Sequence, residues 1–180
     1  MTNPTVIAVA SDTGHNIVKP VQESITLIAG WGVEGDAHAG KTIQHRYDKR
    51  RNPDAPNLRQ VHLMHGELFD QVADLGMEIG PGQMGENITT RGIDLLSLPR
   101  GTHLKMGEAV IEITGLRNPC KYLNNIAPGL MKACIDKYDD GDIFPQSGVM
   151  GIVIGGGEIR AGNDIQIKTP PEPHQRLKPV

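Results

Sequence analysis

Short apolar runs separated by turn residues predict a chain built mainly from β-strands. The stretch "SITLIAG" alternates and is β-branched, which predicts a strand over Ser24 to Ala29, and "RQVHLMH" predicts another over Gln60 to Met64. The run from Val6 to Ala10 also fits a strand. Between Gly80 and Gly115 turn signals recur every few residues around short apolar runs. That pattern is typical of a β-barrel or sandwich and not of alternating strands and helices.

Helical patterns are few and short. The apolar residues of "HGELFDQVADLG" follow helical spacing, and Gly76 ends the pattern. "APGLMKACIDK" predicts a second helix with proline in its first turn. We expect an irregular excursion from Lys41 to Asn57, a hairpin turn at the "GGG" of 155–157, and a tail over 169–180 that is poorly ordered or lies on the surface. The prediction is a mostly β domain with one or two packed helices.

The bulk properties narrow the function classes. A length of 180 residues suits one domain, and a net charge of -3 with a pI near 6.1 gives no support to a nucleic-acid partner. The basic run from Arg46 to Arg51 fits a solvated loop, with an anion-binding arm as the alternative. No apolar run approaches the roughly 20 residues that span a bilayer. With two cysteines and no signal-peptide pattern, we expect free thiols in a reducing, cytoplasmic setting and no membrane association.

The stretch "GLRNPCKYL" places Cys120 between a predicted strand, Ala109 to Thr114, and the helix-like "KYLNNI". A thiol at the start of a helix lies near the positive end of the helix dipole, which favours the thiolate. Arg117 would add positive charge, and Pro119 restricts the backbone before the sulfur. Cys120 is therefore a candidate metal ligand or sulfur carrier, although a structural cysteine also fits. We expect Cys134, on the apolar side of a helical pattern, to be structural.

Two other stretches place polar residues beside glycines. "EGDAHAG" presents Asp36 and His38, a pair that can bind metal or act as acid and base, although Asp36 could equally cap a turn. "GPGQMGENIT" presents Glu86 and Asn87 at the head of an apolar strand. They could cap the turn or hydrogen-bond the polar groups of a bound molecule.

Several common sites are disfavoured. His62 and His65 are close in sequence, but a zinc site would want a third ligand, and neither C-x-x-C nor H-E-x-x-H occurs. On a strand, His62 would lie on the face opposite Val61 and Leu63. The chain also lacks the phosphate-loop pattern and the G-x-S-x-G elbow of serine hydrolases.

Four stretches in this order, "EGDAHAG", "GPGQMGENIT", "GIDLLSLPRGTHLKMGEAVIEITGLRNPCKYL" and "SGVMGIVIGGGEIRAGNDIQI", resemble the MOSC domain. The domain is named for the C-terminal part of molybdenum-cofactor sulfurases. The resemblance runs from about Val21 to Lys168, which leaves residues 1–20 as an N-terminal segment and 169–180 as a polar tail. The R-x-P-C element ending in Cys120 is its most specific part, and the chain resembles a small freestanding member.

The resemblance implies a strongly bent, mostly antiparallel β-barrel in which Cys120 is the key residue. In molybdenum-binding relatives that thiolate coordinates the metal of the molybdenum cofactor (molybdopterin), and related proteins reduce N-hydroxylated compounds. The positions of Glu86, Asn87 and Arg117 match family positions that could face the pterin or its phosphate. Where many relatives carry a basic residue, this chain has Gln146 and Ser147, which puts a phosphate contact there in doubt.

Two main functional hypotheses use the same thiolate. As a molybdenum ligand, Cys120 would lie in a cavity lined by Asp36, His38, Glu86, Asn87 and Arg117. As a sulfur carrier, it would accept sulfane sulfur from a cysteine desulfurase and need only exposure and a docking face. A reductase would need a redox partner, because the chain has no iron–sulfur, flavin or nicotinamide motif, and pyridoxal phosphate belongs to the fusion relatives. A non-catalytic cofactor-binding module is the third alternative.

Overall fold

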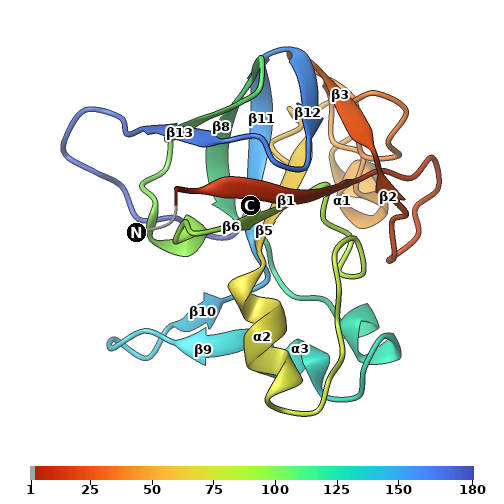
Figure 1. The fold of residues 1–180 in the computed structure, drawn as a ribbon, viewed down its shortest axis with the longest axis vertical. Helices are drawn as coiled ribbons and strands as arrows, with labels where there is room; N and C mark the ends of the chain where they lie inside the picture. Colours follow the sequence, from red (N-terminus) through yellow and green to blue (C-terminus); the bar gives the residue numbers. More distant parts are fainter. Residues whose placement is uncertain (1–2) are drawn as a thin grey trace.

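The computed structural model describes the chain from residue 3 to residue 180, with the backbone alone at residues 46 and 47. Strands dominate it (Figure 1). The largest sheet contains eight strands, in spatial order β13 (Ile165–Lys168), β7 (His103–Met106), β8 (Ala109–Leu116), β11 (Val149–Gly155), β5 (Val61–His65), β6 (Ile88–Arg91), β1 (Thr5–Ala10) and β2 (Val21–Gln22). A three-stranded sheet contains β12 (Gly157–Arg160), β3 (Ser24–Ile28) and β4 (Gly32–Val33), and a separate pair contains β9 (Ile135–Lys137) and β10 (Ile143–Pro145).

The described sheets do not close into a barrel, although the main sheet is mostly antiparallel. Its two ends approach each other where Val6 N donates to Asn163 O over 2.9 Å and Ile165 N donates to Pro4 O over 2.9 Å. The mostly β prediction is confirmed, and the predicted closed barrel is not found. The chain instead forms an open sheet in which the edge strand β13 comes beside the start of β1 at these backbone contacts.

One pair of strands in the main sheet, β5 and β6, is parallel. A parallel pair needs a crossover connection, and α2 (Glu67–Ala73) with the glycine-rich stretch after it provides one. Leu68, Phe69 and Val72 of α2 are buried, which confirms the helix expected from the spacing of its apolar residues. The crossover places "GPGQMGEN" directly before β6, beside the end of β1.

The core has two parts. The larger cluster draws apolar side chains from both the eight-stranded and the three-stranded sheet, for example Leu63, Ile111 and Ile159. The smaller cluster joins α2 to η2 (Lys121–Asn125) and α3 (Leu130–Ala133). In Figure 1 these helices and the β9–β10 pair form a smaller lobe below the strands. Cys120 packs partly against this second cluster, so it lies where the lobe joins the end of β8.

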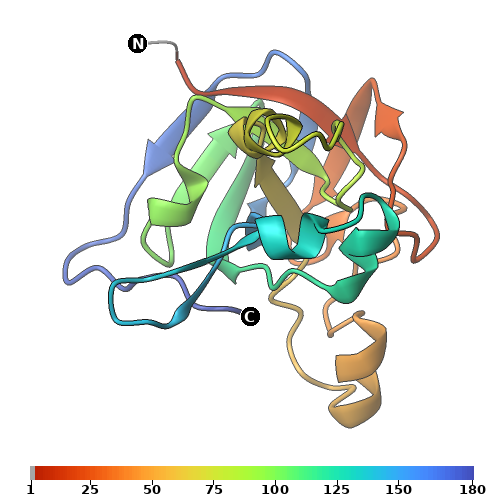
Figure 2. The same cartoon turned by 90° about the horizontal axis from the view of Figure 1, so that it is seen from below.

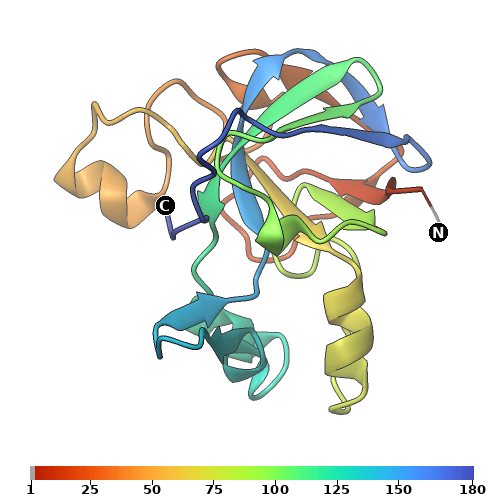
Figure 3. The ribbon, with the colours of Figure 1, turned by 90° about the vertical axis from the view of Figure 1, so that its left-hand side faces the viewer.

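Three of the local predictions were wrong in extent or type. "APGLMKACIDK" is helical over α3 alone, because residues 135–137 pair with β10 as β9. "KYLNNI" is the 3₁₀ helix η2, and η1 (Leu95–Ser97) is a further 3₁₀ turn. The excursion from Lys41 to Asn57 contains α1 (Arg46–Arg51), which stands out from the body in two views (Figures 2 and 3).

Two predictions near the end of the chain also need correction. The "GGG" of 155–157 is not a hairpin turn, because β11 pairs with β8 and β5 whereas β12 pairs with β3. The chain crosses there from one sheet to the other. The tail is mostly exposed, as expected for a surface segment, but Leu177 is buried in the main core and Pro179 forms a bridge with Leu116.

Candidate functional site

A cavity of about 450 Å³ lies beside Cys120. Its walls come from the loops after β1 and β4, the α1 excursion, β5, the turn before β6 and the segment after β8. The side chains at its surface include four histidines and three fixed cations: His15, His38, His45, His62, Lys19, Arg59 and Arg117. The cavity is therefore rich in positive and hydrogen-bonding groups, which suits a polar or anionic ligand.

Cys120 lies on the wall of this cavity, half-buried and without a disulfide. Its backbone is extended and its carbonyl accepts from Leu123 N over 3.0 Å, so it forms the N-terminal boundary of η2. Because η2 is a 3₁₀ helix of five residues, its dipole is small. The positive charge beside the sulfur comes instead from Arg117.

The backbone of Arg117 is fixed by hydrogen bonds, whereas its side chain has an unused hydrogen-bond donor among the described residues. Its N–H donates to Gly148 O over 3.0 Å, and its carbonyl accepts from Ser147 Oγ over 2.8 Å. Burial lowers the pKa of the guanidinium, opposed by the charges of Cys120, Cys134 and Glu86 and by a hydrogen bond to the Cys120 side chain. Its Nη1 is buried and has no hydrogen-bond partner among the described residues. A buried guanidinium N–H without a partner marks a place for an acceptor.

His62 connects the cavity wall to the same turn. It is buried, and its Nε2 donates to Ser147 O over 2.8 Å. Burial and the charge of Arg117 hold its pKa well below the usual value, so the ring is neutral. His65 lies at the end of β5 and does not line the cavity. Among the described residues, no group of three His, Cys, Asp or Glu side chains could hold a metal ion.

The residues at 146 and 147 also have assignable contacts. Ser147 is fully buried, and its hydroxyl donates to the carbonyl of Arg117. The residue therefore helps to hold the Arg117 cation in place, although it carries no charge itself. Gln146 is outside the cavity wall and donates to Asp136 Oδ2 over 3.2 Å.

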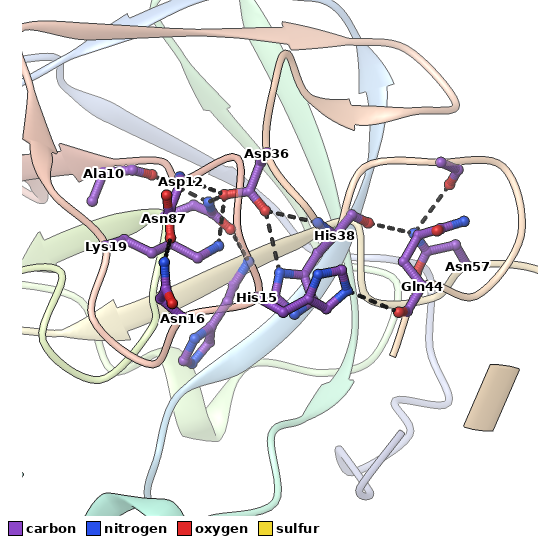
Figure 4. Close-up of polar contacts among 12 residues, drawn as sticks. Ala10, Asp12, His15, Asn16, Lys19, Asp36, His38, Gln44, Asn57 and Asn87 are labelled. Atoms are coloured by element: carbon purple, nitrogen blue, oxygen red, sulfur yellow. Dashed lines mark hydrogen bonds and ion pairs between the residues drawn. The ribbon is translucent and has the colours of Figure 1, made fainter. Parts of the chain in front are cut away.

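Asp36 lies at the centre of a buried polar network behind the cavity wall (Figure 4). Its Oδ2 accepts from Lys19 Nζ over 2.7 Å and from Asn87 Nδ2 over 2.9 Å. Its Oδ1 accepts from His38 N over 3.0 Å and lies 3.3 Å from His38 Nδ1. Burial would raise the pKa of Asp36, but the hydrogen bonds from His38 and the charge of Lys19 outweigh it and lower the pKa well below the usual value.

Asn87 and Glu86 point to different surroundings. Asn87 lines the cavity, accepts from His62 N through Oδ1 and donates to Asp36, so it joins two walls. Glu86 is fully buried and does not line the cavity. Its carboxylate accepts from Gly82 N, Met84 N and the Thr89 hydroxyl. Of the two alternatives for Glu86, the turn-capping role matches this geometry.

The family model of the MOSC domain matches residues 35–166. The chain belongs to the MOSC domain family. Solved structures that are similar include the YuaD protein from Bacillus subtilis, with 20% identity, a TM-score of 0.74 and coverage of 94% of this chain and 98% of that one. YiiM from Escherichia coli has 18% identity, a TM-score of 0.64 and coverage of 97% and 74%. YiiM from Geobacillus stearothermophilus has 17% identity, a TM-score of 0.63 and coverage of 92% and 75%.

At these identities the likeness shows a shared fold alone. No curated protein sequence matches the chain significantly. Among the described residues, none of the helices has the length and apolar character that crossing a membrane requires.

The structure brings four of the six predicted site residues of the MOSC domain to one cavity: His38, Asn87, Arg117 and Cys120. Asp36 lies behind its wall and bonds to His38 and Asn87, which line it, whereas Glu86 lies away from the wall and caps the turn at Gly82. The cavity also contains three residues that the sequence patterns did not indicate: Lys19, His15 and Arg59. Lys19 and His15 precede the matched range, and their place in the cavity depends on contacts 17 or more residues away.

Proposed function

We propose that this MOSC domain binds a molybdenum pterin cofactor in the cavity, with the Cys120 thiolate as a ligand to the metal, and that it reduces N-hydroxylated compounds there. The observation that supports this most is that half-buried Cys120 lines the cavity together with Arg117, whose buried Nη1 has no hydrogen-bond partner among the described residues. A sulfur ligand suits a soft metal, and a buried guanidinium suits an anionic group.

The residues that are present fit such a group. Arg117 and Arg59 offer guanidinium donors to a phosphate, and the His15 ring also lines the cavity. Arg59 is already paired with Asp48 at 3.2 Å, so Arg117 is the stronger candidate for the anionic contact. Lys19 is committed to Asp36, and its charge is balanced there. Cys120 is the one cysteine among the cavity residues, since Cys134 is buried in the smaller core cluster.

The bound cofactor would supply the two-electron redox chemistry of the reaction. The protein's own residues bind, orient and exclude water. Cys120 presents sulfur from a backbone fixed by Pro119, and Arg117 holds positive charge beside that sulfur. Asp36 stays ionised and holds His38 at the wall. The electrons would come from a separate redox partner.

Elemental analysis of the purified protein tests the binding proposal. Protein made in a host that synthesises the cofactor should carry molybdenum and release an oxidised fluorescent pterin. The variant Cys120→Ala should lose both, because the sulfur ligand is gone, whereas Cys134→Ala should keep both and serves as the matched control. Equal molybdenum content in Cys120→Ala and wild type would rule out Cys120 as the ligand.

A turnover assay tests the reductase part. With reduced methyl viologen as electron donor, loaded wild type should convert benzamidoxime to benzamidine, and Cys120→Ala should not. Loaded protein without turnover of benzamidoxime or of hydroxylamine would contradict a reductase and leave a cofactor-binding module.

The sulfur-carrier alternative depends on the same thiol and predicts a different product. Incubation with a cysteine desulfurase and cysteine would add about 32 Da to Cys120 as a persulfide. A protein that takes up this increment, and carries no molybdenum or pterin from a competent host, would be a sulfur carrier and not the reductase proposed here.

A further inference from the structure

We propose that His38 is the proton donor to the leaving oxygen of the substrate and that Asp36 is the residue that positions it. This inference rests on the proposed reductase function. It adds a residue with a defined chemical step to a cavity whose reactive thiol lies on a different segment of the chain.

The hydrogen bonds of Asp36 fix the side on which His38 carries its proton. Both Asp36 oxygens are occupied: Oδ2 by Lys19 Nζ and Asn87 Nδ2, and Oδ1 by the backbone N–H and the ring Nδ1 of His38. An ionised carboxylate can only accept, so His38 Nδ1 must carry hydrogen to complete the contact at 3.3 Å. Nε2 is then the ring atom through which His38 can exchange a proton with a bound molecule.

The two members of the pair have different exposure. The Asp36 side chain is fully buried, whereas 30% of the His38 side chain is exposed, and its ring lines the cavity. A buried carboxylate that orients a histidine and stabilises its charged form is the arrangement used in general acid–base catalysis. The pair therefore places an exchangeable proton at the cavity wall while the counter-charge stays out of reach of the substrate.

The other ionisable groups near His38 are histidine rings and a carboxylate that is already paired. The His15 ring lies 5.2 Å from the His38 ring at 44°, and its Nε2 lies 3.3 Å from Gln44 O. Asp48 supplies a carboxylate on the cavity wall itself, and it pairs with His45 at 2.9 Å and with Arg59 at 3.2 Å.

The charge of Asp36 is also balanced behind the cavity wall. Lys19 balances Asp36 from the side away from the ring. Among the described residues, Asp36 is thus the carboxylate that forms an ion pair with the His38 ring.

The chemical step balances. Reduction of R–NH–OH consumes two electrons and two protons and gives R–NH₂ and water. As the N–O bond breaks, the leaving oxygen takes the proton from His38 Nε2, and the nitrogen takes the second proton from solvent. The electrons come from a one-electron donor protein or, in the assay, from reduced methyl viologen. His38 then regains its proton from solvent while Asp36 keeps its charge.

Kinetics of loaded protein test the donor role. His38→Gln should lower kcat for benzamidoxime by about 10²–10⁴-fold, the usual contribution of general acid catalysis, with little change in KM. Its molybdenum content should match wild type. Added imidazole should restore part of the activity of His38→Ala. The surface variant His103→Gln, whose ring pairs with Glu112 away from the cavity, is the control with unchanged kcat.

The positioning role of Asp36 has its own readout. Nitrogen-15 NMR of wild type without cofactor should show the His38 ring with hydrogen on Nδ1 when neutral. Asp36→Asn should remove that preference and move the alkaline limb of the pH–rate profile to lower pH, because the donor is active only while His38 is protonated. A His38 ring that prefers hydrogen on Nε2 in wild type would overturn the positioning role.

The outcomes separate this inference from the proposed function. Full activity in loaded His38→Gln would overturn the donor role while the reductase function stands. An inactive, fully loaded wild type would remove the reductase function and the donor role together, whatever the NMR result.

Discussion

Arg117 is held in place by hydrogen bonds of its backbone, which leave donors of its side chain free for a ligand. Its backbone N–H and carbonyl bond to the turn at Ser147 and Gly148, and the carbonyl of Ser147 accepts from His62. The side chain keeps one buried nitrogen, Nη1, without a hydrogen-bond partner among the described residues. His62 must stay neutral for this arrangement, because a charged imidazole would lie buried beside a guanidinium.

The neutral His62 predicts a pH-dependent stability. Its pKa is depressed on folding, so below the unfolded value of 6.5 the unfolded chain binds a proton that the folded chain does not. Stability is therefore present above that pH and lost as the pH falls. We expect the free energy of unfolding to fall by about 1.4 kcal/mol from this residue between about pH 7.5 and about pH 5.5.

Urea unfolding at both pH values checks this. The fall should be smaller in His62→Gln than in wild type by that amount, and the comparison isolates His62 from His45 and His65, whose pKa values are also lowered. An identical fall in the two proteins would show that His62 takes up its proton equally well in the folded and the unfolded chain, and would contradict the lowered pKa.

The residue types in the sequence indicated which side chains could form the site. They indicated less well where each side chain lies in the fold. Cys120 and Arg117 stand close in sequence, so their proximity could be inferred. The burial of Asp36 could not, because it depends on Lys19, which lies 17 residues earlier in the chain and which the fold brings to it. Lys19 carried no signal of its own, since a lysine before a proline usually lies on the surface.

At the scale of elements, the turn before β11 fixes the cavity wall against β5. Gly148 has φ +86, and an added Cβ would lie 2.2 Å from Leu63 O and 3.0 Å from His62 Nε2. Glycine is therefore required twice, for the left-handed backbone and for the close approach. This approach lets Ser147 contact both His62 and Arg117.

Gly148→Ala should be strongly destabilising. A matched control is Gly141→Ala, where φ is +87 and nothing lies within 4 Å of the added Cβ. The control should lose about 1 kcal/mol of unfolding free energy for the backbone conformation. Gly148→Ala should lose roughly 3 kcal/mol or more, because the clash with backbone adds to it. Equal losses by thermal unfolding would mean that the turn does not approach β5 closely.

Elements with a regular pattern were predictable, and those that depend on distant pairing were not. The spacing of apolar residues in α2 and their alternation in β3 were sufficient to predict a helix and a strand. The residues after α3 have helical spacing too, but pairing with β10 makes them a strand. Likewise, the glycines of 155–157 fit a hairpin locally, and only the partner strands show that the chain changes sheets there.

At the scale of the whole molecule, the C-terminal segment is part of the folded body. Leu177 belongs to the main core, and Lys178 O accepts from Leu116 N over 2.9 Å at the end of β8. Val180 lines the cavity. The segment therefore packs against β8, the strand that leads to Cys120. The composition of the segment nevertheless resembles that of a disordered tail.

Leu177→Ala should cost about 2–5 kcal/mol of unfolding free energy, as for other buried leucines. Leu75→Ala is the control, because Leu75 is 66% exposed and should change stability by no more than about 0.5 kcal/mol. Chemical denaturation of the two variants distinguishes a packed segment from a loose one. Similar midpoints for both would contradict the packing of the tail.

The central claim is that Cys120 supplies a sulfur ligand to molybdenum in this cavity. X-ray absorption at the molybdenum edge, on wild type and on Cys120→Ser reconstituted with the cofactor, measures it directly. The proposal predicts that the serine variant has one sulfur scatterer fewer than wild type or retains no metal, whereas Cys134→Ser matches wild type. Molybdenum with the same sulfur shell in wild type and Cys120→Ser would contradict it.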